Sequence, residues 1–383
     1  MDFFLDSSSV PNVHVPVAAD APFGVYVHVP FCTKRCDYCA FATWTDKSHL
    51  TKRYVDSVCL DIRRRVDAGM ATASSIFVGG GTPSLLSGVQ MGRILDEIPR
   101  IANAEVTIEC NPDTVSEDLF QAYVDHGVTR ISFGVQSMVS TVLASLGRTH
   151  SPDNVERGVE LVLAAGISTF NLDLIYGAAG ETMDDWVATL AAVAALAPPH
   201  VSAYALTVEA GTPLAADAHR YPDDDDQADK YELATEILAS IGLMSYEISN
   251  WAKPGHECRH NQLYWSQDDY RGFGCAAHSH ARRSDGGSRR WWNLRTPERY
   301  IDAVTSNEPT EASGEDLVPS AVCLEGLQLA LRMSDGVAIS ALSSADRAEF
   351  MEAGLIEVSS DRIRLTSRGR MMANTVSIRL QVS

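Results

Sequence analysis

Short runs rich in β-branched and aromatic residues recur through the first half of the chain, and each is followed by a stretch in which apolar residues keep a helical spacing. The runs lie at residues 24–31, 75–81, 106–112, 130–137, 170–177 and 200–208. This alternation predicts a βα repeat of about six units, and therefore an α/β fold with a parallel sheet, open or closed into a barrel. In such sheets functional residues gather at the carboxyl ends of the strands.

Capping residues and helix breakers mark where the helices between these runs begin and end. Ser151-Pro152 predicts the start of a helix that Gly166 ends. Thr182 starts another, which stops at the breaker Pro198-Pro199. Both stretches place apolar side chains on one face, as expected of helices that cover a sheet.

The later part of the chain follows a different pattern. An acidic run at 222–229 precedes a helix predicted at about 230–241, and we interpret the run as its solvated start. Further on, the pattern predicts helices at 321–333 and 345–353 and a short hairpin at 355–366. This last group is typical of a small winged-helix-like α+β domain, which need not bind DNA.

The patterns divide the chain into four parts. The first is an N-terminal arm at 1–23, and the second is the α/β repeat from 24 to about 250. An extension follows at about 251–315, and the winged-helix-like domain occupies about 316–383. One large domain with a smaller one agrees with the size expected of a chain of this length.

Composition and charge narrow the range of possible functions. The chain has 383 residues, of which 45% are hydrophobic, and a net charge of −19, so an extended nucleic-acid partner is disfavoured. The arm lacks the pattern of a secretory signal, and no apolar run has the length of a membrane span. Eight cysteines are too sparse for a disulfide scaffold, and a tight cluster of them favours metal binding in the reducing cytoplasm.

The first predicted strand leads into the most informative motif, F-C-T-K-R-C-D-Y-C-A-F. Cys32, Cys36 and Cys39 are spaced C-x3-C-x2-C, and Phe41 stands where a fourth cysteine would fit. Structural zinc normally takes four ligands, and His28 lies too near on the same strand to be an obvious fourth. A [4Fe–4S] cluster on three cysteines leaves one iron open to the amino and carboxylate groups of S-adenosylmethionine. Zinc and incidental thiols remain alternatives at this point.

Three further predicted strands carry unusual residues, within the strand or at its end, and Gln136-Ser137 ends a fourth. Gly79-Gly80-Gly81 suits either close approach of a ligand or a plain tight turn. Glu109 and Asp173 are carboxylates in predicted strands, where such residues are uncommon unless they have a partner. Asp173 shares a strand face with Asn171, and a buried salt bridge to Arg148 is the alternative to a ligand-binding role.

Taken together, Y-V-H-V-P-F-C-T-K-R-C-D-Y-C-A-F, G-G-G-T-P-S, E-C-N-P-D, R-I-S-F-G-V-Q-S, L-G-R-T-H and N-L-D-L-I-Y-G resemble the radical S-adenosylmethionine enzymes of the oxygen-independent coproporphyrinogen dehydrogenase group. The resemblance runs in order from residue 24 to about 280. It implies a partial (β/α)6 TIM-like barrel with a [4Fe–4S] cluster on the three cysteines. The positions that match this group's S-adenosylmethionine site are Tyr26, Tyr38, Gly80, Gly81, Thr82, Glu109, Gln136, Arg148 and Asp173.

Phe41 separates two branches of that group. The dehydrogenase branch resembles C-x3-C-x2-C-x-C, whereas a sister branch, the heme chaperone family called HemW, has phenylalanine at the last position. The motifs S-A-Y-A-L-T-V-E-A-G-T-P-L, Y-E-I-S-N-W-A, H-N-Q-L-Y-W and Y-R-G-F-G-C-A-A-H-S resemble the same branch. This resemblance implies a protein that binds heme as cargo and delivers it to acceptor proteins.

The candidate heme ligand is His260 in H-N-Q-L-Y-W, because neutral imidazole is a common iron ligand. The alternative is that His260 and Trp265 brace the end of the barrel. Cys258 is a second candidate ligand, although an isolated cysteine is usually a small buried apolar residue. The hairpin expected at 281–294 either docks heme with its arginines and Trp291-Trp292 or is a solvated hairpin with covering aromatics.

Two positions depart from the HemW pattern. Y-G-A-A-G-E-T at 176–182 lacks the usual Leu-Pro before the glycine, and Cys275 stands where a small residue without a thiol is more typical. The first departure is expected to loosen a loop near the nucleotide without removing Asp173. The second leaves open whether Cys275 touches heme.

Three functions compete at this stage. The first is a cytoplasmic heme chaperone whose partners are heme-acceptor proteins and an electron donor. Membrane-bound respiratory enzymes are candidate acceptors, although nothing in the sequence anchors the chain in a membrane. Whether the protein forms a homodimer stays open. The second is the oxygen-independent coproporphyrinogen III dehydrogenase, against which stand Phe41 and an N-terminal arm without that enzyme's extended region. The third is a radical enzyme with another substrate, since a fold and its cofactor do not fix the substrate.

Overall fold

The computed structural model of the protein describes residues 21–382. The expected N-terminal arm therefore lies outside the described residues, apart from its last positions 21–23. No helix among the described residues combines the length and the apolar character that crossing a bilayer requires.

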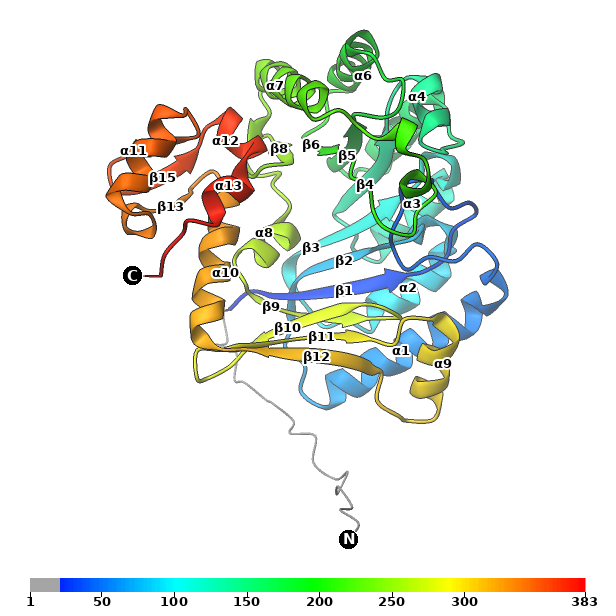
Figure 1. Ribbon diagram of the computed structural model, residues 1–383. Helices are drawn as coiled ribbons and strands as arrows, with labels where there is room; N and C mark the ends of the chain where they lie inside the picture. The colour runs from blue at the N-terminus through cyan, green and yellow to red at the C-terminus, as the bar shows by residue number, and fades with distance from the viewer. Residues whose placement is uncertain (1–20, 383) are drawn as a thin grey trace.

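The predicted βα repeat is present, and its strands form the centre of one sheet. Adjacent strands of the repeat are parallel throughout, and the helices lie mainly on the outer face of the curved sheet (Figure 1). The strands are β1 (Phe23–Val29), β2 (Ala73–Gly80), β3 (Arg100–Cys110), β4 (Arg130–Gln136), β5 (Thr169–Tyr176) and β6 (His200–Ala205). The helices between them are α1 (Thr51–Asp67), α2 (Gly88–Asp96), α3 (Glu117–Asp125), α4 (Ser140–Ser145), α5 (Pro152–Ala164) and α6 (Met183–Ala195).

The sheet stays open, because further strands extend it at both ends instead of closing it: β9 joins β1 in parallel, and the other added strands pair antiparallel. Its order is β12-β11-β10-β9-β1-β2-β3-β4-β5-β6-β8-β7 (Figure 1). The added strands are β7 (Met244–Ser245), β8 (Asn250–Ala252), β9 (Asp269–Phe273), β10 (His278–Arg282), β11 (Ser288–Asn293) and β12 (Glu311–Leu317). The fold is thus the expected partial barrel, and the predicted hairpin at 281–294 corresponds to β10 and β11.

Local capping explains where the helices begin. The Ser151 and Thr182 side chains accept hydrogen bonds from backbone N–H groups in the first turns of α5 and α6, as the sequence predicts. Helix α7 (Asp224–Ser240) begins earlier than predicted, because Asp223 caps it and Asp224, Asp225 and Asp226 form its first turn. Three carboxylates beside the positive end of the helix dipole favour this start. The acidic run is therefore part of the helix.

The end of the chain folds around a hydrophobic core of its own, which includes Leu331, Phe350 and Ile363. A three-stranded antiparallel sheet and four helices form it, as the winged-helix-like pattern predicts. They are α10 (Pro319–Arg332), β13 (Val337–Ala338), α11 (Ser344–Glu352), β14 (Ile356–Ser359), β15 (Arg362–Leu365), α12 (Ser367–Met371) and α13 (Ala373–Ser377). The domain boundaries drawn from the sequence stay predictions.

Candidate functional site

The cysteine motif forms a loop between β1 and α1 that is closed at its base. Cys32 N–H donates to the Trp44 carbonyl (3.1 Å), and Trp44 N–H donates to the Pro30 carbonyl (2.8 Å). A further N–H from Cys39 to the Cys36 carbonyl (3.2 Å) folds the tip. These bonds hold three thiols on one short loop at the carboxyl end of β1.

All three cysteines line a cavity of about 580 Å³ at the carboxyl ends of the parallel strands, a volume within the range of small-molecule sites. Burial raises the pKa values of Cys32 and Cys39, so without a metal these groups are thiols, and metal binding must release their protons. Within residues 21–382 no group of three histidine, cysteine or acidic side chains is arranged to hold a single metal ion. In a cubane [4Fe–4S] cluster the three cysteines each bind a different iron.

Two residues that line the same cavity carry buried polar atoms without a hydrogen-bond partner. Arg148 donates to the Gly134 carbonyl (2.7 Å) and to Cys36 Sγ (3.5 Å), yet its buried Nε has no hydrogen-bond partner. The buried Gln136 Oε1 also lacks a partner. Gln136 has φ of 58°, a left-handed conformation that a non-glycine residue seldom adopts, so its placement at the end of β4 carries strain. Buried, unpaired donors and acceptors of this kind fit a polar ligand.

Two carboxylates form another part of the wall. Glu109 accepts a hydrogen bond from Gly80 N–H (3.0 Å), and burial together with nearby Asp173 raises its pKa to about 7. Asp173 accepts from Ser132 Oγ (2.8 Å) and Asn171 Nδ2 (2.7 Å). Its hydrogen bonds come from neutral groups and Arg148 contacts Gly134, so the alternative of a buried Asp173–Arg148 salt bridge is wrong.

The glycine run leaves space for the cysteine loop. Gly80 has φ of 113°, and a Cβ there would lie 2.5 Å from the His28 ring. A Cβ on Gly81 would lie 2.6 Å from the Phe31 carbonyl oxygen and 3.0 Å from Cys32 Sγ. A side chain at Gly80 would displace the His28 ring of β1, and one at Gly81 would displace the start of the cysteine loop, which explains the choice of glycine.

Eight of the nine residues predicted to bind S-adenosylmethionine line this cavity: Tyr38, Gly80, Gly81, Thr82, Glu109, Gln136, Arg148 and Asp173. Tyr26 is the exception. Its hydroxyl lies 3.0 Å from His28 Nδ1, and His28 Nε2 lies 2.9 Å from the Ala42 carbonyl oxygen, so Tyr26 supports the cysteine loop from below.

Sequence reasoning missed the part of the wall that follows β5 and β6. Ile175 and the segment 204–207 line the cavity, as does Glu209. The apolar run at 200–208 predicts one continuous strand, but β6 ends at Ala205 and the chain then turns into the site. Phe41, 62% exposed, also lines the cavity, where a fourth cysteine would otherwise stand.

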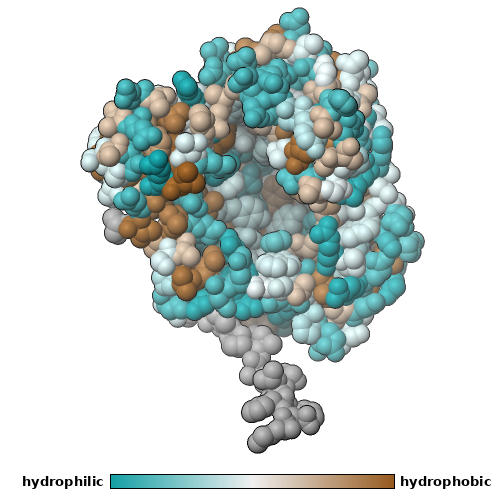
Figure 2. Space-filling model, in the orientation of Figure 1, coloured by the Kyte–Doolittle hydropathy of each residue, from teal (hydrophilic) through white to brown (hydrophobic). Residues whose placement is uncertain are grey.

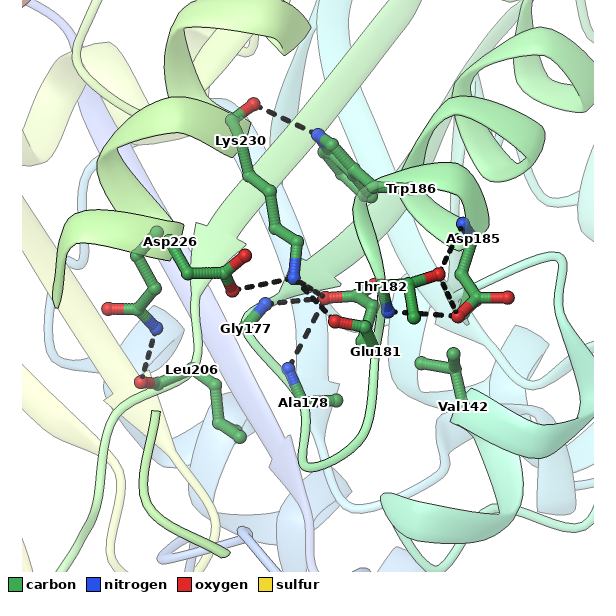
Figure 3. Close-up of polar contacts among 12 residues, drawn as sticks. Val142, Gly177, Ala178, Glu181, Thr182, Asp185, Trp186, Leu206, Asp226 and Lys230 are labelled. Atoms are coloured by element: carbon green, nitrogen blue, oxygen red, sulfur yellow. Dashed lines mark hydrogen bonds and ion pairs between the residues drawn. The ribbon is translucent and has the colours of Figure 1, made fainter. Parts of the chain in front are cut away.

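A buried ion pair holds the loop after β5, where the sequence departs from the HemW pattern (Figure 3). Glu181 accepts N–H bonds from Gly177 (2.6 Å) and Ala178 (3.3 Å), and Lys230 Nζ of α7 lies 3.2 Å from its carboxylate. Lys230 also donates to Asp226 (2.7 Å). Because the carboxylate closes the loop and the ammonium anchors it, this segment keeps a defined shape without the Leu-Pro pair.

His260 lies away from the cavity. It belongs to α8 (Arg259–Trp265), and its ring contacts Ser75 Oγ through Nδ1 (2.9 Å) and Tyr264 Oη through Nε2 (2.8 Å). The side chain has no exposed surface, and burial lowers its pKa to about 3. Ser75 precedes the cavity residue Gly80 on the same strand by about 16 Å at the usual rise per residue. The heme-ligand role of His260 stays a prediction, and in this geometry it requires Tyr264 to move away.

The other candidate thiols are buried. Cys258 contacts Glu105 (3.6 Å), and burial raises its pKa to about 12. Cys275 accepts from Tyr54 Oη (3.5 Å), and burial raises its pKa to about 12 as well. Both groups are protonated at neutral pH and neither lines the cavity, so neither is placed to bind iron in this geometry.

The arginines of the β10–β11 hairpin are paired with carboxylates. The pairs are Arg282 with Asp268 and Asp269, Arg283 with Asp285 and Asp316, Arg289 with Glu311 and Asp316, and Arg290 with Glu315 and Glu325. Trp291 and Trp292 are adjacent on a strand and so face opposite sides of the sheet. This arrangement favours the solvated hairpin over a joint Arg and Trp cradle.

Comparisons with known proteins give the family. Residues 26–193 match the Radical SAM superfamily. The heme chaperone HemW of Mycobacterium tuberculosis is 39% identical over 371 residues, which cover 93% of this chain and 94% of that protein. The chain belongs to the HemW family.

Relatives in other bacteria extend the match. HemW of Escherichia coli is 38% identical over 76% of this chain and 80% of its own length, and HemW of Bacillus subtilis is 29% identical over 92% and 97%. Among solved structures, coproporphyrinogen III oxidase (HemN) from Escherichia coli, a radical SAM enzyme, superposes with a TM-score of 0.81 over 94% of this chain and 90% of that one. At 22% identity this likeness shows the fold that HemW shares with HemN.

Proposed function

We propose that this protein is a heme chaperone that binds heme and passes it to acceptor proteins, and that a [4Fe–4S] cluster and S-adenosylmethionine occupy the cavity at the carboxyl ends of β1–β6. The observation that carries the proposal is the match to heme chaperones over nearly the whole chain, 93% of it for the relative from Mycobacterium tuberculosis. The match includes the extension and the C-terminal segment, beyond the part that the superfamily shares.

The cavity supports the cofactor assignment by its chemistry. Cys32, Cys36 and Cys39 are the proposed cluster ligands, and a cluster bound by three cysteines supplies an open iron and an electron to the nucleotide's sulfonium. Arg148 offers an unpaired donor to the methionine carboxylate, which a guanidinium can meet bidentately. Glu109 and Asp173 provide acceptors for the ammonium group or the ribose hydroxyls.

Phe41 supports a carrier over a coproporphyrinogen dehydrogenase. The side chain is 62% exposed at the cavity, so this position presents an apolar ring where the dehydrogenase branch has a thiol. The fold itself does not separate the two functions, since a shared scaffold hosts different chemistries.

The setting of this function is also proposed. We place the protein in the cytoplasm, where eight cysteines stay reduced, with heme-acceptor proteins as partners and an electron donor for the cluster. Membrane-bound respiratory enzymes are candidate acceptors, and a homodimer is a candidate assembly.

Two measurements on one anaerobically reconstituted preparation test the proposal. The first is a hemin titration followed by absorbance. The second is incubation with S-adenosylmethionine, a reductant and coproporphyrinogen III, followed by mass analysis of the tetrapyrrole. We expect saturable heme binding and no decarboxylated product. Decarboxylation over many turnovers, or no heme binding, would overturn the chaperone assignment.

A further inference from the structure

The segment between β6 and α7 folds into a compact strap, residues 206–221. Its second half consists of two 3-10 helices, Leu214–Ala216 and Ala218–Arg220. In its first half the Thr212 hydroxyl donates to the Glu209 carbonyl oxygen (2.6 Å), which closes a turn. A surface loop that satisfies its own polar groups in this way keeps a defined shape.

The strap contacts both the cavity and the cysteine loop. Near its start, Leu206 and Glu209 line the cavity. Further along, the Leu214 N–H donates to the carbonyl oxygen of Asp37, which directly follows Cys36 in the cysteine loop (2.9 Å). The strap therefore lies beside that loop (Figure 1), and Figure 2 shows the molecule hollowed at the centre of the same face, with the strap at the edge of the hollow.

Arg220 fastens the far end of the strap to the same loop. Its Nη2 donates to the carbonyl oxygen of Ser145, the last residue of α4 (2.5 Å), and lies 2.9 Å from Asp37 Oδ2. The Asp37 N–H in turn donates to the Leu146 carbonyl oxygen (3.3 Å). One guanidinium thus joins the strap, the cysteine loop and the end of α4 through charge-assisted hydrogen bonds, which are stronger than neutral ones.

The chain after α4 leaves room for the Asp37 carboxylate. Gly147 has φ of 75°, and a Cβ there would lie 2.8 Å from Asp37 Oδ1. Its glycine lets the two segments approach closely. The next residue, Arg148, belongs to the predicted nucleotide site and donates to Cys36 Sγ (3.5 Å). The contact between Asp37 and Arg220 therefore lies one residue away from a predicted cluster ligand on one segment and near Arg148 on the other.

Apolar side chains join the same three segments. A hydrophobic cluster separate from the main core includes Leu146 after α4 and Leu206 and Leu214 of the strap, and Tyr38 of the cysteine loop packs against it. Leu206 and Leu214 are buried. The cysteine loop is therefore held against the strap by an apolar contact beside Cys36 as well as by the ion pair.

We propose that Arg220 is a positioning residue for the [4Fe–4S] cluster: through Asp37 it holds the strap against the cysteine loop and so keeps the cluster bound and shielded. The inference rests on the cofactor assignment in the proposed function and names the residue that orders the loop of the cluster ligands. A loop that is already ordered loses less conformational freedom when it binds, so it retains its ligand longer.

The test compares the full wild-type chain with Arg220→Ala, Arg220→Lys and Asp37→Asn. Two rates are measured: the removal of iron from the anaerobically reconstituted protein by the ferrous chelator bathophenanthroline, and the hydrogen exchange of residues 31–44 in the cluster-free chain. For Arg220→Ala we expect iron release about three- to tenfold faster and faster exchange in 31–44, a modest effect because exposed ion pairs are weak. The urea midpoint of unfolding should stay close to that of the wild type.

Two further variants and the conservative exchange sharpen the comparison. Arg220→Lys keeps the positive charge and should release iron more slowly than Arg220→Ala. The double variant Asp37→Asn/Arg220→Ala should release iron no faster than Arg220→Ala, because both changes act on one contact. The matched control is Arg93→Ala, which breaks a pair of the same kind with Asp56 (2.8 Å) between α2 and α1, and it should keep the wild-type rates.

The outcomes separate this inference from the function on which it rests. If the wild-type chain takes up no iron and sulfide, the cofactor assignment fails and the inference with it. If the wild type holds a cluster and Arg220→Ala matches it in iron release and in exchange of 31–44, only the inference fails. Faster release that Arg93→Ala shares, that comes with a lower urea midpoint, or that Arg220→Lys does not slow also refutes positioning, because the effect is then not specific to this contact.

Discussion

Lys230 Nζ lies 3.2 Å from a carboxylate oxygen of Glu181, and neither side chain has any exposed surface. The ammonium also donates to the Glu181 carbonyl oxygen (2.9 Å) and to Asp226 (2.7 Å), so one cation joins α7 to the loop after β5 (Figure 3). Gln227 of α7 donates to the carbonyl oxygen of Leu206, a residue of the cavity wall (3.0 Å). The start of α7 thus braces two loops at the predicted nucleotide site.

Replacement of Lys230 by methionine is expected to lower the free energy of unfolding by about 3–5 kcal/mol at pH 8, because it leaves a buried carboxylate without its cation. Burial already raises the pKa of Glu181, and without Lys230 the folded protein has to bind a proton there. A carboxyl whose folded pKa lies above its unfolded pKa loses stability as pH rises, so the defect should shrink at pH 5. Urea unfolding at both pH values measures this.

Two variants serve as controls for that experiment. Glu181→Gln combined with Lys230→Met removes the stranded charge and should recover part of the loss. Asp226→Asn alters a partner whose side chain is 40% exposed and should cost no more than about 1 kcal/mol. A Lys230→Met chain as stable as the wild type at pH 8 would show that the pair contributes nothing.

Glu109→Gln should separate stability from nucleotide binding. Burial and nearby Asp173 raise the pKa of Glu109 to about 7, so its ionisation opposes folding as pH rises from about 4.5 through 7. The glutamine variant should therefore be more stable than the wild type at pH 8 and equal to it at pH 4. Affinity for S-adenosylmethionine should rise through pH 7 in the wild type and be low and flat in the variant. An unchanged affinity would remove Glu109 from the site.

The cluster assignment predicts that Cys32/Cys36/Cys39→Ala loses bound iron, sulfide and the brown absorbance after anaerobic reconstitution. The matched control is Cys323→Ala, which removes an exposed thiol on α10, remote from the cysteine loop in the chain. Iron and sulfide analysis of both variants measures the effect. Full retention of iron and sulfide in the triple variant would refute the ligand set.

Much of this site follows from residues close together in sequence, and the rest depends on long-range packing. The cysteine spacing, the glycine run and the strand-end carboxylates predict one cavity, because parallel strands bring their carboxyl ends together. The segment 204–207 was not predicted, since an apolar run does not show where a strand ends. The position of His260 depends on Ser75, 185 residues earlier, a contact that no local pattern indicates.

Arg148→Lys is expected to lower the affinity for S-adenosylmethionine by about 10–100-fold while the cluster is retained. A hydrogen bond to a charged group contributes about 1.5–3 kcal/mol, and lysine cannot reproduce the fork of a guanidinium. Calorimetry on the reconstituted protein measures the affinity, and iron content reports the cluster. Arg63→Lys, at a 54% exposed side chain of α1, controls for the exchange itself. Equal affinities in all three chains would mean that another group meets the methionine carboxylate.

His260→Ala distinguishes a buried support from a heme ligand. The ring joins Ser75 on β2 to Tyr264 on α8, and its loss leaves both hydroxyls unpaired in an apolar setting. The free energy of unfolding should therefore fall by on the order of 2–4 kcal/mol. Because this ring packs against Phe77 with centroids 5.4 Å apart, the structural change should be confined to the surroundings of β2 and α8. The heme spectrum of the folded variant should match the wild type. A heme spectrum that changes in the folded His260→Ala chain would restore His260 as the ligand, and would mean that α8 opens when heme binds.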